Sequence, residues 1–209
     1  MYKKVLVLSP HTDDGELGAG GTIARFVEEG SDVYYAALSG CEMSVPEGLE
    51  KNTLKTECRL ATKTLGIPPD NVILLNYEVR KFPLNRQEIL DSLIELNKKI
   101  EPDLVLLPSS NDTHQDHRTI HEEGIRAFKK TSSMWGYEHP WNNLTFTTDI
   151  FIKLEGRHME NKIKTLGQYK SQDIKNYFNP VYINAWAFTR GTEIDVPLAE
   201  AFELIRLIM

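Results

Sequence analysis

The first half of the chain alternates short apolar runs with longer segments in which apolar residues recur every three or four positions. The short runs predict buried strands at residues 5–8, 33–38, 72–75 and 104–107. The longer segments predict helices at residues 21–29, 49–65, 86–100 and 120–129. Strand–helix units in succession indicate a three-layer α/β fold, in which helices cover both faces of a mostly parallel sheet. The strands suit this arrangement because parallel strands are buried on both faces and are apolar throughout.

The pattern changes after residue 131. Residues 135–143 are aromatic and polar with a proline among them, which predicts a loop, and residues 145–153 alternate as a strand does. Residues 159–169 have helical spacing, whereas residues 198–209 fit either a helix or a closing strand. Because no repeat, low-complexity segment or linker divides the chain, we expect one domain over residues 1–209.

Composition excludes several classes of protein. No stretch approaches the roughly 20 apolar residues of a membrane-spanning helix, and the N-terminus lacks the apolar core of a signal peptide, so we expect a cytoplasmic protein without membrane insertion. The net charge of −6 argues against nucleic acid as a main partner. With only Cys41 and Cys58 present, a metal would be held by His, Asp or Glu.

Two polar loops follow predicted strands and hold most of the reactive side chains. The loop after the first strand carries His11, Asp13, Asp14 and Glu16 within six residues. A turn followed by a helix cap would account for one or two of these carboxylates, but it leaves His11 unexplained.

The loop after the fourth strand carries His114, Asp116, His117 and Arg118, and a solvated capping segment is the alternative interpretation. If the first and fourth strands are neighbours where the strand order reverses, both loops open into one crevice. Two imidazoles and a carboxylate there would suit zinc with an open fourth position. A further carboxylate beside the metal is typical of metal-assisted hydrolysis.

The two loops resemble the motifs of a known family. They read Pro10-His11-Thr12-Asp13-Asp14-Gly15-Glu16-Leu17-Gly18-Ala19-Gly20 and His114-Gln115-Asp116-His117. They are similar to the patterns (P/A)-H-P-D-D-x-E-x-x-x-G and H-x-D-H of the PIG-L/LmbE-like family of zinc-dependent N-acetylglucosamine deacetylases. The resemblance extends over residues 3–131 and implies a Rossmann-like fold with catalytic loops after the first and fourth strands. Thr12 replaces the usual proline, which removes no metal-binding atom.

The resemblance implies a ligand set and a substrate. The implied ligands of one Zn²⁺ per chain are His11, Asp14 and His117, although other divalent metals remain open. The substrate would be an N-acetylglucosamine-type amino sugar or its conjugate, and a homo-oligomer is expected from the resemblance alone.

It also implies catalytic roles. Asp13 would be the general base for a zinc-activated water, His114 would stabilise the oxyanion and protonate the leaving amine, and Asp116 would orient an imidazole. Arg80, which follows the third strand, and Arg118 are candidates for substrate contacts. Each arginine could equally be an ordinary surface residue.

Two other functions use the same residues. A metallophosphoesterase would usually need two metals about 3.5–4 Å apart and ligands from further loops. A non-catalytic sugar- or nucleotide-binding relative is suggested by the glycines after the first strand. However, Ile23 occupies the third glycine position of G-x-G-x-x-G, and no Walker A lysine is present.

Overall fold

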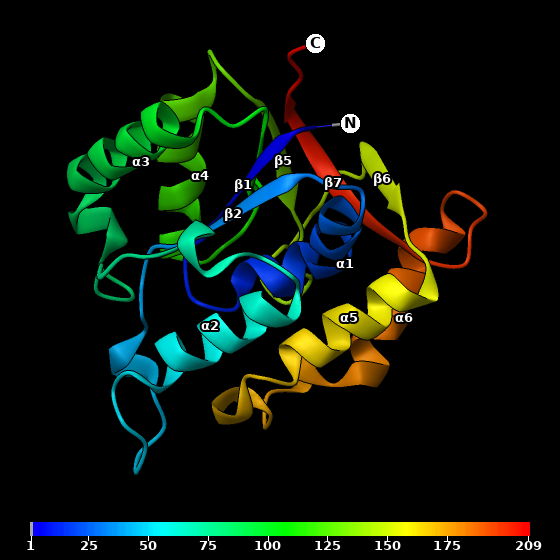
Figure 1. Ribbon diagram of the computed structural model, residues 1–209, viewed down its shortest axis with the longest axis horizontal. Helices are drawn as coiled ribbons and strands as arrows, with labels where there is room; N and C mark the ends of the chain where they lie inside the picture. Colours follow the sequence, from blue (N-terminus) through cyan, green and yellow to red (C-terminus); the bar gives the residue numbers. More distant parts are fainter. Residues whose placement is uncertain (1) are drawn as a thin grey trace.

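The computed structural model describes residues 2–209, whose strands form one seven-stranded sheet in the order β3-β2-β1-β4-β5-β7-β6 (Figure 1). β1 to β5 run parallel, and β7 runs antiparallel to both β5 and β6. The strands are β1 (Lys4–Ser9), β2 (Asp32–Ala37), β3 (Val72–Leu74), β4 (Leu104–Pro108), β5 (Ser133–Tyr137), β6 (Ile150–Lys153) and β7 (Ala199–Arg206).

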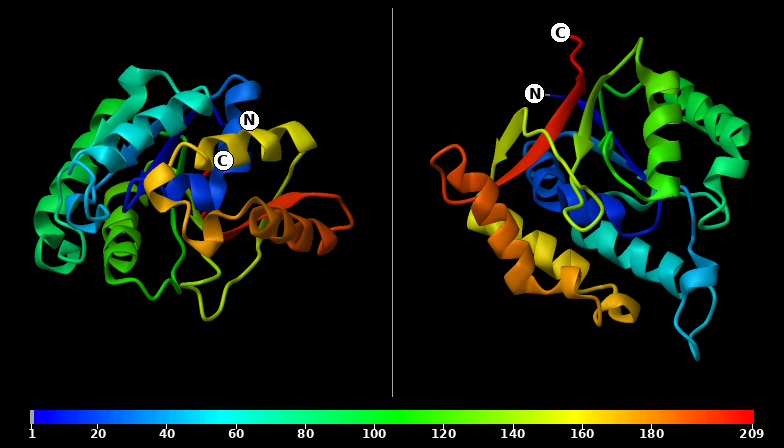
Figure 2. Two further views of the ribbon diagram at one scale, coloured as in Figure 1. Left: turned by 90° about the horizontal axis from the view of Figure 1, so that it is seen from below. Right: turned by 180° about the vertical axis from the view of Figure 1, so that it is seen from behind.

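Helices cover both faces of the sheet, which confirms the predicted three-layer α/β fold. α3 and α4 pack on one face, whereas α1, α2, α5 and α6 lie on the other (Figures 1 and 2). The helices are α1 (Asp14–Glu28), α2 (Thr53–Thr64), α3 (Arg86–Ile100), α4 (Gln115–Phe128), α5 (Gly156–Leu166) and α6 (Pro180–Thr192). Short 3₁₀ turns lie at Glu42–Ser44, Pro69–Asn71, Phe82–Leu84, Lys170–Gln172 and Asn176–Phe178.

β1 shows how the apolar strands divide the core. Val5 and Val7 point into the core shared with α1, whereas Leu6 and Leu8 point into the core shared with α3 and α4. All four side chains are fully buried. Because successive side chains of a strand point to opposite faces, a strand buried on both faces has to be apolar throughout, as this one is.

The strand order reverses at β1, which pairs with β2 on one side and β4 on the other. The register places Val7 opposite Leu106, so β1 and β4 end side by side. The loops that follow these strands therefore open at the same edge of the sheet. This confirms the predicted placement of both polar loops at the point where ligands bind in such folds.

Several element boundaries differ from the sequence prediction. α1 begins at Asp14 and α4 at Gln115, several residues before the predicted starts, so Asp14, Asp116 and His117 occupy first helical turns. Glycines near the beginning of α1 lower its helix propensity, so the sequence pattern did not indicate its first turn. The predicted loop at 135–143 begins inside the buried strand β5, whose two aromatic residues resembled the polar loop that follows. The open choice at 198–209 is resolved as β7. α6 was not predicted, although Asn179 caps its start and Pro180 is its first residue.

Candidate metal centre

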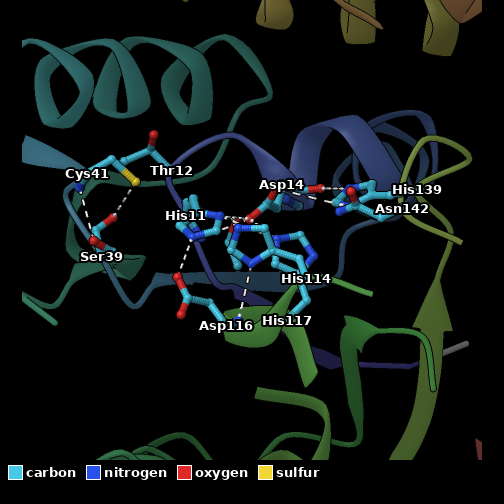
Figure 3. Close-up of polar contacts among 12 residues, drawn as sticks. His11, Thr12, Asp14, Ser39, Cys41, His114, Asp116, His117, His139 and Asn142 are labelled. Carbon is cyan, nitrogen blue, oxygen red and sulfur yellow. Dashed lines mark hydrogen bonds and ion pairs between the residues drawn. The ribbon is translucent and has the colours of Figure 1, made fainter. Parts of the chain in front are cut away.

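Three donor atoms converge where β1 and β4 end (Figure 3). His11 Nδ1 lies 2.9 Å from Asp14 Oδ2, His117 Nε2 lies 3.1 Å from the same oxygen, and the two nitrogens are 3.3 Å apart. His11 comes from the loop after β1, Asp14 is the first residue of α1, and His117 lies in the first turn of α4. The structure thus brings together the three residues that the sequence predicted as ligands.

The far nitrogen of each imidazole faces a buried carboxylate. His11 Nε2 lies 3.0 Å from Asp116 Oδ2, and His117 Nδ1 lies 2.7 Å from Asp112 Oδ2. Each carboxylate accepts a hydrogen bond from its ring, which puts the proton of the neutral imidazole on that far nitrogen. In neutral imidazoles, the form that binds a metal, the near nitrogens His11 Nδ1 and His117 Nε2 have lone pairs that face Asp14.

This geometry suits a metal ion. With neutral imidazoles, three acceptors lie close together, so they repel one another unless a proton or a metal ion lies between them. Ligands of tetrahedral zinc at about 2.0–2.1 Å are separated from one another by roughly 3.3–3.4 Å, close to the separations found here. Two imidazole nitrogens and a carboxylate oxygen are also the donor types that zinc accepts. The residues present therefore fit a zinc-like divalent ion.

The electrostatics of the metal-free site agree. Burial disfavours a charged imidazole, yet the Asp14 and Asp116 carboxylates raise the pKa of His11 to about 10. Against the same burial, Asp14 and Asp112 raise the pKa of His117 to about 9. Burial alone would raise the pKa of Asp14, but the two imidazoles outweigh this effect and hold its pKa well below the usual range. The site thus attracts positive charge strongly.

Short local hydrogen bonds hold the loop after β1. The backbone N–H of His11 donates to Asp14 Oδ2 at 2.8 Å, and Ser9 Oγ accepts from the N–H of Gly15 at 3.0 Å. A Cβ at Gly15 would lie 2.7 Å from a Val7 methyl group, so glycine lets α1 approach the sheet closely. These contacts give Gly15 a packing role.

Glu16 stabilises the same loop from the side away from the cavity. Its carboxylate accepts hydrogen bonds from the hydroxyls of Tyr35 and Tyr169, and Tyr169 also donates to the backbone oxygen of Thr12 at 2.6 Å. Glu16 is fully buried and lies outside the lining of the cavity described below. Burial raises its pKa to about 8. These contacts favour a structural role for Glu16 over a catalytic one.

Asp13 lines the same cavity as the three metal-binding atoms. Within residues 2–209, no other side chain forms a hydrogen bond with the Asp13 carboxylate. Burial and then the charge of Asp14 raise the pKa of Asp13 above its ordinary value. An unpartnered buried carboxylate with a raised pKa is suited to accept a proton.

His114 caps the N-terminus of α4. Its Nδ1 accepts a hydrogen bond from the backbone N–H of Asp116 at 3.2 Å, which leaves the ring proton on Nε2. Burial and the charges of His117 and His11 lower the pKa of His114 to about 4. It is therefore a neutral hydrogen-bond donor at the edge of the site.

A cavity of about 240 Å³, slightly below the usual range for ligand pockets, is lined by His11, Asp13, Asp14, His114 and His117. Arg80 lines it as well, and its backbone N–H donates to Asp116 Oδ2 at 2.6 Å. This contact holds Arg80 in the left-handed region, with φ of 70°. Arg118 is exposed and lies outside the lining. The rest of the wall includes Trp141, Asn142, Lys175 and Tyr177.

Two further buried residues contact the proposed ligands, and neither contact was predicted. Asp112, which lies two residues before His114, was not expected to orient His117. His139 is fully buried, and its Nε2 donates to the backbone oxygen of Asp14 at 3.0 Å. Its Nδ1 has no hydrogen-bond partner and lies 3.7 Å from Asp112 Oδ2. His139 could have been found from its position just after β5, but residues 135–137 of that strand were predicted as part of a loop.

Comparison with known proteins identifies the family. Residues 6–128, more than half of the chain, match the family described as "PIG-L: GlcNAc-PI de-N-acetylase". The chain belongs to the PIG-L family. It is 25% identical over 174 residues to the "uncharacterized deacetylase YaiS" of Escherichia coli K12, covering 81% of this chain and 91% of that protein. It is 32% identical over 134 residues to the diacetylchitobiose deacetylase of Thermococcus kodakarensis, covering 60% of this chain and 49%, about half, of that relative.

Solved structures share the fold of this PIG-L protein. The N,N'-diacetylchitobiose deacetylase of Pyrococcus horikoshii superimposes with a TM-score of 0.82 at 23% identity, over 98% of this chain and 84% of that one. The conserved protein TT1542 of Thermus thermophilus gives 0.80 at 23% identity, over 100% and 97%. The 4-carboxy-2-hydroxymuconate hydratase GalB of Pseudomonas putida KT2440 gives 0.73 at 18%, over 99% and 98%. At such identities the likeness shows the fold, and GalB shows that the fold alone does not fix the chemistry.

Within residues 2–209, none of the helices combines the length and apolar character that crossing a membrane requires.

Proposed function

We propose that this protein is a zinc-dependent hydrolase that removes the N-acetyl group from an N-acetylglucosamine-type amino sugar or its conjugate. The observation that carries the proposal is the convergence of three acceptor atoms, from His11, Asp14 and His117, beside the unpartnered carboxylate of Asp13. Membership of the PIG-L family and the name of the Thermococcus relative support an acetylated sugar as the substrate.

His11, Asp14 and His117 would hold one Zn²⁺, with Asp116 and Asp112 fixing the two imidazoles. When bound, such an ion would supply a Lewis acid that polarises a carbonyl group and makes water more acidic.

Asp13 would carry the proton transfers, and His114 would stabilise the developing negative charge. Asp13 takes a proton from a water molecule while the oxygen of that water attacks the carbonyl carbon of the acetamide. The Nε2–H of His114 donates a hydrogen bond to the oxygen that becomes negatively charged, a contribution that is often large in acyl transfer. When the C–N bond breaks, the departing amine takes the proton that Asp13 accepted from water, so Asp13 returns to a carboxylate and His114 keeps its own Nε2 proton. The products are acetate and a free amine.

Substrate contacts are proposed for both arginines. Arg80 lines the cavity and would contact the sugar ring. Arg118 lies outside the lining, so it would reach only a substituent that extends beyond the cavity. The modest volume suits one sugar ring in the cavity, with the remainder of a conjugate at its mouth.

The test is the variant Asp13→Asn. Loss of the general base is expected to lower acetate release by about 10²–10⁴-fold, while zinc content stays at one ion per chain. Acetate would be measured over a screen of N-acetylglucosamine glycosides, and zinc by elemental analysis. Asp70→Asn, at an exposed site away from the cavity, is the matched control.

Activity of the Asp13→Asn variant near that of the wild type would remove Asp13 as the base. If the zinc-loaded wild type released phosphate from a matched phosphoester but acetate from no substrate, the site would be that of a phosphoesterase. Binding of acetylated sugars without any turnover would indicate a non-catalytic relative.

A further inference from the structure

Lys175 lines the cavity from the segment that joins α5 and α6, on the wall formed by Tyr177 and Trp141. Its backbone is held on both sides, because its N–H donates to Gln172 O at 3.0 Å and its oxygen accepts from Phe178 N–H at 2.9 Å. The lysine is therefore anchored in its place at the mouth.

A stack of aromatic rings lies beside Lys175. Its ammonium lies 5.5 Å from the centre of the Tyr177 ring. Tyr177 stacks on Trp141 at 4.3 Å and 11°, and Trp141 stacks on His139 at 4.8 Å and 16°. Both faces of Trp141 are thus covered by neighbouring rings. The stack is accordingly a wall that positions Lys175 rather than a free platform for a sugar ring.

The charge of Lys175 has no carboxylate partner of its own. Lys175 is the lysine that lines the cavity, and it forms no ion pair within residues 2–209. The acids of the cavity wall, Asp13 and Asp14, have other roles in the proposed function. Although burial opposes the charged form, Asp13 raises the pKa of Lys175 above its ordinary value, so the ammonium keeps its charge at neutral pH.

We propose that Lys175 binds an oxyanion, a phosphate or a carboxylate, on the part of the substrate beyond the sugar ring. This inference rests on the proposed deacetylase function and names its substrate class as an anionic conjugate of the acetylated sugar. A charged ammonium without a partner at the mouth of a site in an acidic protein attracts such a group, and its three N–H donors suit the oxygens of phosphate or carboxylate.

The experiment compares glycosides that differ only in charge. N-acetylglucosamine 1-phosphate and the carboxymethyl glycoside are the two anionic probes, and the methyl glycoside is the neutral one. We expect the wild-type kcat/KM to favour at least one anionic probe by about tenfold. In Lys175→Gln that preference should fall towards unity through a higher KM. Lys175→Arg should keep most of it, and salt should reduce it in the wild type.

Lys170→Gln is the matched control, because Lys170 is exposed on the same segment and lies outside the cavity lining. The inference is wrong if the wild type shows no preference for either anionic probe. It is also wrong if Lys175→Gln lowers kcat equally on all three probes and shifts the pH profile, since Lys175 would then act through Asp13.

Failure of the proposed function gives a different pattern, with no acetate released from any probe. Calorimetric binding of N-acetylglucosamine 1-phosphate and the carboxymethyl glycoside to the zinc-loaded protein then decides the role of Lys175. Binding of either about tenfold weaker in Lys175→Gln than in the wild type supports it, whereas equal binding of both overturns it.

Discussion

At the scale of single residues, each imidazole of the metal centre is oriented by a carboxylate on its far side. Asp112 accepts the hydrogen bond from His117, and Asp116 does the same for His11. Asp116 also accepts from the backbone N–H of Arg80, so one carboxylate links a ligand to the cavity wall. Such partners are expected to matter for metal affinity almost as much as the ligands themselves.

Asp112→Asn tests this support. Burial works against a charged Asp112, but the hydrogen bond from His117 holds its pKa well below the usual range, so the carboxylate is ionised. A neutral amide would orient His117 less firmly and make its Nε2 a weaker donor. Zinc affinity, measured by competition with a chelator, is expected to fall by about 10–100-fold. Asp70→Asn should bind zinc like the wild type, and unchanged affinity of Asp112→Asn would contradict the role.

Residue placement could be predicted where it depends on short motifs. His11, Asp13, Asp14, His114 and His117 lie in two loops that follow neighbouring strands, and all five line one cavity. His139 and Lys175 reach the same cavity region from parts of the chain with weak patterns. Their positions depend on tertiary packing of β5 and of the α5–α6 segment, which local sequence does not encode.

At the scale of elements, the helical geometry of α1 is interrupted, and a buried ion pair binds the backbone groups on either side of the interruption. Ala19 leaves helical geometry, with φ of −141° and ψ of 15°. Beyond the break, Glu200 accepts from the N–H groups of Gly21 and Thr22 at 3.0 and 2.7 Å. Lys162 donates to Leu17 O and to Glu200, both at 2.7 Å. β7 and α5 thus satisfy the backbone groups that the break exposes.

The same break explains the missed start of α1. Glycines near its beginning lower helix propensity, and the sequence pattern became helical only after them. A Cβ at Gly18 would lie 2.5 Å from Tyr137, and one at Gly20 would lie 2.9 Å from Lys162. These glycines permit close packing of α1 against β5 and α5, which propensity alone cannot predict.

Lys162→Met should destabilise the fold strongly. Lys162 is 2% exposed, and its removal leaves Glu200 buried without its counter-charge. Breaking one partner of a buried pair costs about 3–5 kcal/mol, measurable as the free energy of unfolding in urea. Lys164→Met, on the exposed side of α5, should change stability by no more than about 0.5 kcal/mol. Equal stabilities of the two variants would mean that the pair contributes little.

At the scale of the whole molecule, the candidate metal centre joins the two helical layers. His11 and Asp14 belong to the β1–α1 unit, whose helix packs on one face of the sheet, whereas His117 belongs to α4 on the other face. The site also gathers several acidic side chains of a protein with a net charge of −6. A bound cation would reduce repulsion among these carboxylates and hold α1, β1 and α4 together.

Metal removal should therefore lower the stability of the entire fold. A ligand that binds only the native state stabilises it by about 2.7 kcal/mol at a free concentration of one hundred times Kd. Thermal melting of chelator-treated protein, with and without zinc restored to that level, measures the difference. His117→Ala should lose most of the zinc-dependent increase in Tm because a ligand is gone. His158→Ala, whose imidazole contacts Glu28 far along α1, should keep the full increase. A His117→Ala variant that gained as much stability from zinc as the wild type would place the ion elsewhere. The three converging atoms would then need a proton or a water molecule between them instead.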